Sequence, residues 1–420
     1  MIVPSIDLMG GQAVQLVGGE ALAIEAGDPF PLAERFSRVG EIAVIDLDAA
    51  LGQGSNAHLI EGLCARYPCR VGGGIRSEAA ARRWLDAGAR KIILGTAAEP
   101  ELLAKLPRHR LIAALDARSG EVVTHGWRTR TGARIEDRMA ELAPYVSGFL
   151  VTFVEKEGRL GGTDMDRVAP LVQSAGEARV TIAGGVTTPG EIAELDRLGC
   201  DAQVGMALYT GRLGLAEAFA APLTSDRPDG LWPTVVTDPH GRALGLCWSN
   251  AESLTAALDR GRGVYWSRRR GLWEKGATSG ATQQLIGVAL DCDRDALRFV
   301  VQQQAPGFCH LDTWTCWGEA GGVPALFRQL QARAADAPEG SYTRRLLQDA
   351  DLLRAKVLEE AGELVDATEP AHVAEEAADL LYFTLVRMVA AGVSLQDVEA
   401  VLDRRALKVT RRPGNAKPSP

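Results

Sequence analysis

Short apolar runs alternate with amphipathic segments over the first half of the chain. The apolar runs have the length of buried strands and lie at residues 42–50, 90–96, 111–117, 148–154 and 179–186. The segments between them space their apolar residues as amphipathic helices do, as at 58–67, 101–106 and 135–146. Alternation of this kind is typical of a parallel sheet whose strands are connected by helices.

The same half of the chain also repeats itself. Val71-Gly-Gly-Gly-Ile75 recurs as Ile182-Ala-Gly-Gly-Val186, and Leu94-Gly95 recurs as Val204-Gly205. Ile6-Asp7 likewise recurs as Leu115-Asp116. All three pairs are separated by about 110 residues, a spacing that indicates an internal duplication. Two four-unit halves predict an eight-stranded (β/α)₈ barrel, also called a TIM barrel, over residues 1–222.

In each half, predicted strands end at glycine residues. Backbone N–H groups there can approach a phosphate closely because glycine has no Cβ. A single glycine pair of this kind is as easily explained by a tight turn. Its symmetric repetition favours two phosphate sites, built from Gly73, Gly74, Gly95, Thr96, Gly184, Gly185 and Gly205.

Asp7 and Asp116 occupy equivalent positions at the carboxyl ends of predicted strands 1 and 5. Active sites of such barrels lie on that face. A lone aspartate there is more often a helix cap, but a symmetric pair suits general acid and base work on a sugar held between its two phosphates. We therefore expect both aspartates to be catalytic.

Proline-rich segments divide the chain of 420 residues into several domains. Pro222–Pro233 contains three prolines and a glycine, and Gly318–Pro324 has a similar composition, so both are predicted linkers. The barrel is then followed by a small α+β metal-binding domain at 228–320 and an all-α domain at 325–410. Residues 411–420 are polar and proline-broken, and we expect them to be disordered.

Composition narrows the class of protein. A hydrophobic fraction of 46% with 24% charged residues can bury several cores without disulfides, and an odd cysteine count of seven argues for a reducing compartment. The N-terminal apolar run is broken by Pro4 and Asp7, so neither a signal peptide nor a membrane segment is expected. With a net charge of −8, small-molecule chemistry in the cytoplasm is favoured over nucleic-acid binding.

The second segment combines aromatic and basic residues with a candidate metal site. Tyr265–Arg270 alone could be a solvated strand pair or a nucleic-acid patch. In Asp291–Asp295 three carboxylates alternate with other residues, so an extended strand would place them on one face for Mg²⁺ and Cys292 on the other for Zn²⁺. Cys309 and Cys316 offer two further sulfurs and leave one coordination position open for water, and His310 could relay a proton. An acidic turn beside buried cysteines is the alternative.

The third segment is helical throughout by its apolar periodicity. Its carboxylates recur at helical spacing, so that residues three or four apart share a face. Two facing acidic helices could hold Mg²⁺ against a pyrophosphate, whereas the alternative is a solvated, charged helix face. The candidate ligands are Glu359, Glu360, Glu363, Glu376 and Asp379.

The barrel segment resembles the phosphoribosylformimino-aminoimidazole carboxamide ribotide isomerases of histidine biosynthesis through IDLMGGQAV, VIDLDAALGQGSN, VGGGIRS, ALDARSGEVVTHGW and AGGV. The resemblance implies a metal-free Amadori rearrangement of an aminoaldose to an aminoketose. Asp7 and Asp116 would be the acid/base pair, and the remaining contacts would come from Arg76, Trp127, Thr152 and Glu157. Gln15 departs from the family's usual arginine, and Glu157 from its aspartate. The sister imidazole glycerol phosphate synthase cyclase, and a non-catalytic scaffold, are the alternatives.

The second segment resembles phosphoribosyl-AMP cyclohydrolase through WSRRR, LWEKGATSG, DCDRD and the C-H-x₅-C pattern. The resemblance implies zinc on Cys292, Cys309 and Cys316, shared between two subunits, and magnesium on Asp291, Asp293 and Asp295. Substrate contacts would come from Trp266, Arg268, Lys275 and Ser279. Ala277 and Ala281 depart from the family's pattern.

The third segment resembles phosphoribosyl-ATP pyrophosphohydrolase through residues 338–343 and Lys356–Glu360, although related helical nucleotide pyrophosphohydrolases share the acidic pattern. Together the three resemblances imply consecutive steps acting on phosphoribosyl nucleotides. They also imply a homodimer through the cyclohydrolase and helical domains.

Overall fold

The computed structural model describes residues 1–124, 127, 129–318, 321–411 and 414. It divides into two compact units, one of Met1–Phe308 with Ala406–Pro420 and one of Cys309–Arg405. Most of the predicted disordered tail, and residues 319–320 of the second predicted linker, lie outside the described residues.

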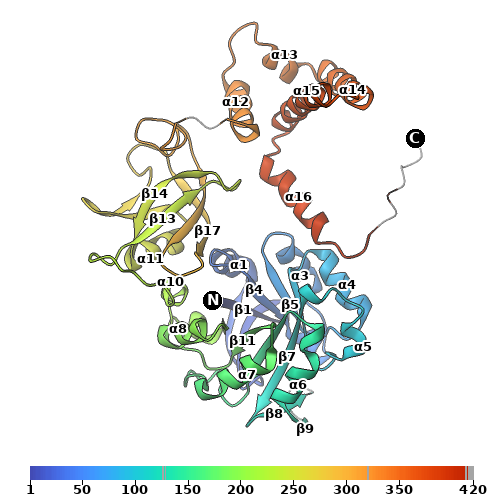
Figure 1. Cartoon of the computed structure of the whole chain (residues 1–420), viewed down its shortest axis with the longest axis vertical. Coiled ribbons are helices and arrows are strands. Elements are labelled where there is room, and N and C mark those ends of the chain that lie inside the picture. Colours follow the sequence, from blue (N-terminus) through green and yellow to red (C-terminus); the bar gives the residue numbers. More distant parts are fainter. Residues whose placement is uncertain (125–126, 128, 319–320, 412–413, 415–420) are drawn as a thin grey trace. The chain divides into compact units, whose positions relative to one another are not determined.

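In the described part of the first unit, parallel strands close into the predicted barrel (Figure 1). The ring closes because β12 pairs with β1 and β10 pairs with both β7 and β11. Its eight strands are β1 (Ile2–Met9), β4 (Ile42–Asp46), β5 (Cys69–Gly72), β6 (Lys91–Leu94), β7 (Leu111–Arg118), β10 (Gly148–Phe153), β11 (Arg179–Ala183) and β12 (Asp201–Val204).

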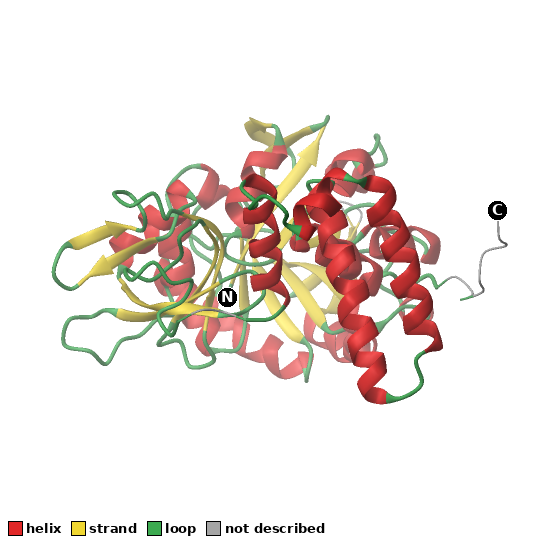
Figure 2. Ribbon diagram, turned by 90° about the horizontal axis from the view of Figure 1, so that it is seen from above, coloured by secondary structure: helices red, strands yellow, loops and turns green. Residues whose placement is uncertain are grey.

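Helices alternate along the chain with the strands of the ring, and Figure 2 colours helices red and strands yellow. Several begin at a side-chain cap directly after a strand: Ser77 caps α4, and Thr188 with Glu191 forms a capping box on α8. The helices are α1 (Pro29–Ser37), α2 (Leu47–Leu51), α3 (Ala57–Cys64), α4 (Glu78–Ala87), α5 (Pro100–Leu103), α6 (Ile135–Leu142), α7 (Val168–Ala175), α8 (Pro189–Arg197), α9 (Met206–Tyr209) and α10 (Leu215–Ala220).

Two hairpins extend from equivalent strands of the two halves. β2 (Gln12–Val17) and β3 (Ala21–Gly27) continue β1 as an antiparallel ribbon. β8 (Glu121–Thr124) and β9 (Thr129–Arg134) do the same after β7. The duplication therefore extends to the segments that follow Asp7 and Asp116.

A buried charged side chain crosses the interior of the barrel near the amino ends of its strands. Arg70 on β5 donates to the Thr181 hydroxyl on β11 at 3.3 Å and lies 3.6 Å from the Asp201 carboxylate on β12. All three residues are less than a tenth exposed. Because these strands do not neighbour β5 in the ring, the guanidinium fills the inside of the barrel there.

The rest of the first unit is a small α+β fold. Its sheet has the order β14 (Ala243–Ser249), β13 (Trp232–Thr237), β18 (Leu297–Gln303) and β17 (Gln283–Leu290). α11 (Ala251–Arg260) and the ribbon of β15 (Val264–Ser267) with β16 (Gly271–Glu274) complete it. The first predicted linker is too long at its end, because Trp232 and Pro233 already pair with β14. Proline is tolerated near the start of a strand.

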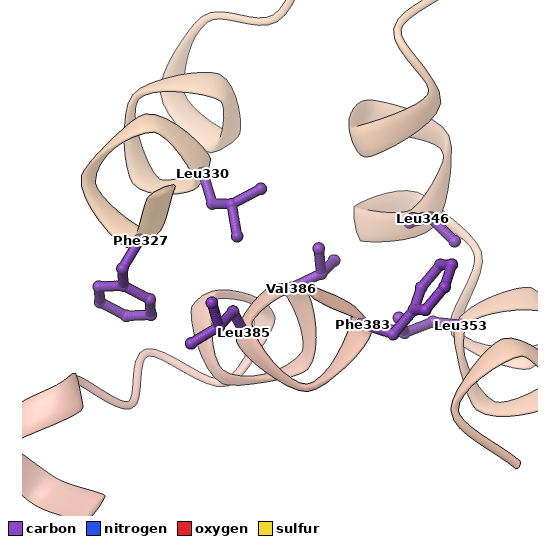
Figure 3. Close-up of a cluster of buried hydrophobic side chains, with 7 residues drawn as sticks. All are labelled: Phe327, Leu330, Leu346, Leu353, Phe383, Leu385 and Val386. Carbon is purple, nitrogen blue, oxygen red and sulfur yellow. The ribbon is translucent and has the colours of Figure 1, made fainter. Parts of the chain in front are cut away.

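The second unit is helical, as predicted. α12 (Val323–Ala335), α13 (Tyr342–Gln348), α14 (Ala350–Asp366) and α15 (Pro370–Ala390) surround one apolar core (Figure 3), and α16 (Leu395–Leu407) follows. The core side chains are Phe327, Leu330, Leu346, Leu353, Phe383, Leu385 and Val386. Among the described residues, no single helix is long and apolar enough to cross a membrane, and only the bent pair α15 and α16 reaches that length and composition together.

Candidate active and metal sites

A cavity of about 1040 Å³ opens at the carboxyl ends of the barrel strands. This is the face on which barrel enzymes carry their active sites. Every barrel residue that the sequence predicted for the site lines this cavity: Asp7, Gly73, Gly74, Arg76, Gly95, Thr96, Asp116, Trp127, Thr152, Glu157, Gly184, Gly185 and Gly205.

The two glycine turns of the cavity require glycine. Gly73 and Gly184 have φ values of +94° and +88°, and a Cβ on either would collide with a backbone carbonyl. Their turns lead toward α4 and α8, whose first N–H groups are capped by the side chains of Ser77 and of Thr188 with Glu191. Each half of the barrel therefore offers a glycine turn whose own backbone an anion could approach closely.

Asp7 and Asp116 lie on the floor of the cavity, at the ends of β1 and β7. Burial raises the pKa of Asp7 to about 7, although a hydrogen bond from the Gln15 amide at 3.3 Å opposes the shift. Burial also raises the pKa of Asp116, against hydrogen bonds from Trp127 and Thr152. A carboxyl group that titrates near neutral pH can both donate and accept a proton.

Glu157 joins the two aspartates from the segment that follows β10. Its pKa is raised to about 7, first by burial and then by the negative charges of Asp7 and Asp116. The structure thus brings three carboxyl groups into mutual electrostatic contact at one end of the cavity. The longer arm of Glu157, a departure in the sequence, reaches the same site.

Gln15 is a site residue that the sequence marked only as a departure. It is 3% exposed on β2, and its amide donates to the Val14 carbonyl at 2.9 Å as well as to Asp7. A side chain on Gly205 would collide with the Gln15 amide oxygen, so the glycine leaves room for it. The strand register pairs Asp7 with Val14 rather than with Gln15, so the only signal in the sequence was the departure from arginine at this position.

The raised carboxyl pKa values predict a pH-dependent stability of the barrel. Asp7 and Glu157 retain protons in the folded chain up to about pH 7, whereas in the unfolded chain they lose them near pH 4. Their contribution is therefore fully present below about pH 4 and is lost as the pH rises through about 7. Asp7→Asn should raise the free energy of unfolding at pH 8 by on the order of 2 to 4 kcal/mol, and change it little at pH 4.

Calorimetry of the barrel transition measures this effect, with an expected gain of about 5 to 15 °C at pH 8. Asp137→Asn, at an exposed carboxylate of α6, is the matched control and should leave the transition unchanged at both pH values. Equal shifts at pH 4 and pH 8 would contradict the titration account.

In the second segment, the prediction of an extended strand at Asp291–Asp295 is wrong. β17 ends at Leu290, and the Asp291 carboxylate accepts hydrogen bonds from the backbone N–H groups of Asp295 and Ala296 at 3.0 and 3.1 Å. Arg294 adopts a left-handed φ of +65°, which an extended strand excludes. The segment is a tight turn, here called the acidic turn, between β17 and β18.

The acidic turn nevertheless gathers the predicted ligands. Carboxylate oxygens of Asp291, Asp293 and Asp295 all lie within 4.8 Å of one another. Asp293 and Asp295 are exposed, so a cation could reach them from solvent. A set of hard oxygen donors in this arrangement fits Mg²⁺.

The cysteines divide between the two units. Cys292 follows Asp291 in the first unit and is exposed, whereas Cys309 and Cys316 belong to the second. The pKa of the Cys309 thiol is lowered, chiefly by the Leu311 backbone N–H and then by the Thr313 side chain and Cys316. A favoured thiolate fits a zinc ligand, and the His310 ring lies 3.8 Å from the Cys309 sulfur. The three-sulfur site remains a prediction.

The expected substrate residues of this segment have different surroundings. Lys275 is 7% exposed and donates to the Ala281 carbonyl at 3.4 Å, whereas Arg268 is exposed and stacks over Trp248. Trp266 is half-buried on β15, and the Ser279 hydroxyl accepts from the Ala281 backbone N–H. Their joint role in binding a substrate stays a prediction.

In the helical unit, α14 and α15 bring together three of the five predicted ligands. Carboxylate oxygens of Glu360, Glu363 and Glu376 lie within 4.8 Å of one another. Glu359 is outside this group, and Asp379 is exposed. Lys356 pairs with Glu359 at 3.0 Å and with Glu360 at 2.9 Å, and the His372 ring lies 3.0 Å from Glu376.

The three glutamates form an environment that suits a cation. Burial first, and then Glu376, Glu360 and Glu359, raise the pKa of Glu363. One buried oxygen of Glu376 has no hydrogen-bond donor among the described residues. An unpartnered buried acceptor beside like charges is costly unless a cation offsets it, so this donor set fits Mg²⁺.

Comparison with known proteins accounts for all three segments. Residues 1–214 match the family model described as histidine biosynthesis protein, residues 245–318 match phosphoribosyl-AMP cyclohydrolase, and residues 323–406 match phosphoribosyl-ATP pyrophosphohydrolase. The chain belongs to the histidine biosynthesis protein family. The three resemblances in the sequence are thereby confirmed, in the same order.

Three relatives differ in how much of their length matches this chain. A histidine biosynthesis trifunctional protein of Neurospora crassa is 42% identical over 349 residues, which cover 79% of this chain and 36% of that protein. A bifunctional histidine biosynthesis protein of Schizosaccharomyces pombe is 53% identical over 49% of each chain. An imidazole-4-carboxamide isomerase of Gemmatimonas aurantiaca is 39% identical over 52% of this chain and 99% of its own length. The chain thus spans only part of the two fungal relatives.

Proposed function

We propose that this chain carries out three consecutive steps of histidine biosynthesis. The helical domain, at about 325–410, hydrolyses phosphoribosyl-ATP to phosphoribosyl-AMP and pyrophosphate. The domain at 228–320 opens the adenine ring by hydrolysis, and the barrel at 1–222 isomerises the resulting aminoaldose to the ketose. The observation that supports this most directly is the presence of all three family matches, in one chain.

The barrel cavity has the groups that an Amadori rearrangement needs. The turns of Gly73 and Gly184 would each hold one phosphate, which places the sugar between them over the aspartates. One of Asp7 and Asp116 protonates the ring oxygen to open the sugar, and the other removes the C2′ proton. Glu157 supports ring opening, Thr152 holds Asp116 by a hydrogen bond, and Trp127 covers the substrate.

The two other interpretations of the barrel have less support. The relative that this chain covers over 99% of its length is an isomerase, which favours isomerisation over the synthase cyclisation. A scaffold without activity has no need of the two buried aspartates or of the glycine turns, all of which line the cavity.

The metal sites would work through residues of this chain. Cys292, Cys309 and Cys316 would hold zinc, which when bound supplies Lewis-acid activation of water for attack on the adenine ring. Asp291, Asp293 and Asp295, and separately Glu360, Glu363 and Glu376, would hold magnesium beside the phosphates. His310, adjacent to Cys309, is placed to move a proton.

We also infer a cytoplasmic homodimer. Apolar side chains are exposed on the described faces of α14 and α15, with exposures of 63% for Leu358, 81% for Val365 and 39% for Leu381. A second copy of the helical domain would cover them. None of the seven cysteines, all of which the structure describes, forms a disulfide, which is compatible with a reducing compartment.

A coupled assay tests the whole proposal. The purified chain with Mg²⁺ and Zn²⁺ should convert phosphoribosyl-ATP to pyrophosphate and the ketose, with phosphoribosyl-AMP and the aldose as transients. Mass spectrometry identifies the hydrolysis products, and chromatography separates the two isomers of equal mass. Prior removal of zinc should stop the sequence at phosphoribosyl-AMP, because only the second step uses it.

Each failure has its own meaning in this assay. An aldose that accumulates without ketose would reduce the barrel to a scaffold, and consumption of supplied ketose with ammonia would favour the synthase. Normal ring opening after zinc removal would eliminate the three-cysteine site.

A further inference from the structure

One ion pair connects barrel helix α8 to the acidic turn. The Arg294 guanidinium meets both Asp196 carboxylate oxygens, from Nε at 3.0 Å and from Nη2 at 3.1 Å. The Asp196 side chain is 10% exposed and that of Arg294 is 24% exposed. A two-point contact with this degree of burial fixes the orientation of the guanidinium as well as its distance.

Arg294 also determines the shape of the turn from within. Its third nitrogen, Nη1, donates to the Asp291 carbonyl at 2.6 Å, and its left-handed backbone reverses the chain between the carboxylates. Its own carbonyl accepts from the Thr224 backbone N–H at 2.8 Å. The guanidinium therefore links the turn to α8, and Thr224 links it to the segment that leaves the barrel.

These contacts bear directly on cation binding. Three carboxylates gathered within 4.8 Å repel one another, so the turn tends to open unless other contacts hold it closed. Arg294 offsets part of this charge and, being a cation, cannot itself be a ligand. The free energy needed to bring the carboxylates together is therefore supplied by the fold before a cation binds. Supporting residues of metal sites raise metal affinity in this way.

We propose that Asp196 of the barrel is a positioning residue for the cation site of the cyclohydrolase segment, acting through Arg294. This inference rests on the proposed function in one respect, the binding of magnesium by the acidic turn. It assigns to the barrel helix a role in a neighbouring reaction, separate from its own cavity. The cyclohydrolase segment in isolation would lack this partner.

The test uses the full-length chain with Glu360→Gln as background, so that added Mn²⁺ reports on the acidic turn rather than on the helical site. Electron paramagnetic resonance then gives the Mn²⁺ affinity. Asp196→Asn and Arg294→Met should each weaken it about tenfold, the lower end of the range for supporting residues of metal sites. The double variant should be no weaker than either single one, because both remove the Arg294–Asp196 contact. Asp196→Asn also removes the pair of Asp196 with the Met1 ammonium at 3.0 Å, which Arg294→Met leaves in place.

Further variants separate positioning from general destabilisation. Asp259→Asn breaks the Arg35–Asp259 pair of 3.3 Å, which also joins the barrel to the second segment but includes no residue of the acidic turn, and should leave Mn²⁺ affinity unchanged. Arg294→Lys keeps the charge without the two-point contact and should give an intermediate affinity. Saturating Mg²⁺ should restore ring opening of supplied phosphoribosyl-AMP in Asp196→Asn.

Two results would overturn the inference in distinguishable ways. Parental Mn²⁺ affinity in both Asp196→Asn and Arg294→Met would overturn the inference alone. If Asp293→Asn also leaves Mn²⁺ affinity unchanged, the turn is not a cation site, and the magnesium part of the proposed function fails with it.

Discussion

Asp7→Asn is expected to lower isomerisation by about 10²- to 10⁴-fold, the usual contribution of a positioned acid or base. Asparagine keeps the size of the side chain and can still accept from Gln15, but it cannot take or give a proton at neutral pH. Both hydrolytic steps should continue at parental rates, because their candidate residues lie outside the barrel cavity. Supplied aminoaldose, followed by chromatography, measures the effect.

Asp137→Asn serves again as control, since it also removes one barrel carboxylate but at an exposed position on α6. Isomerisation by Asp7→Asn near the parental rate would exclude Asp7 as acid or base. Joint loss of all three activities would instead indicate a folding defect. The expected gain in barrel stability at pH 8 provides an independent check on that point.

Glu360→Gln is expected to lower pyrophosphate release from phosphoribosyl-ATP by at least about 100-fold. The substitution removes the charge of a proposed magnesium ligand itself, which should weaken the site more than loss of a residue that only positions a ligand. Glu360 is 5% exposed and lies with Glu363 and Glu376, so its loss leaves two of the three gathered carboxylates. Glutamine keeps the size and nearly the helix propensity of glutamate. The variant should still convert supplied phosphoribosyl-AMP to the ketose.

The control is Glu375→Gln, an exposed carboxylate of α15 next to Glu376 but outside the gathered group. It should release pyrophosphate at the parental rate. Parental release by Glu360→Gln itself would mean that these acids are a charged helix face, and the pyrophosphohydrolase step would be withdrawn.

The barrel and its cavity could be predicted from the sequence because the duplication places each functional residue at the end of a strand. Strand ends meet on one face of a barrel, so Asp7 and Asp116 had to lie together once the alternation was recognised. The alternation of strands and helices does not fix where the side chains of the hairpins after β1 and β7 lie. Gln15 was therefore missed as a neighbour of Asp7, because the register pairs Asp7 with Val14 and the Gln15 amide reaches the carboxylate from the next position.

The acidic turn and the helical site show what sequence spacing leaves open. Alternating aspartates fit a strand. The Asp291 carboxylate instead accepts hydrogen bonds from the backbone N–H groups of Asp295 and Ala296 and so favours a turn, as aspartate side chains often do. On α14, spacing indicates which residues share a face, but not which face meets α15. Glu360 is inside because it lies two helical turns after the core residue Leu353.

The buried guanidinium of Arg70 has a consequence for traffic through the barrel. It bonds across the interior to Thr181 and approaches Asp201, so it is one of the side chains that fill the ring at the end opposite the cavity. The described cavity lies at the opposite, carboxyl ends of the strands. In the proposed isomerisation, substrate would enter and product would leave through that face, so bound product would compete directly with the next substrate.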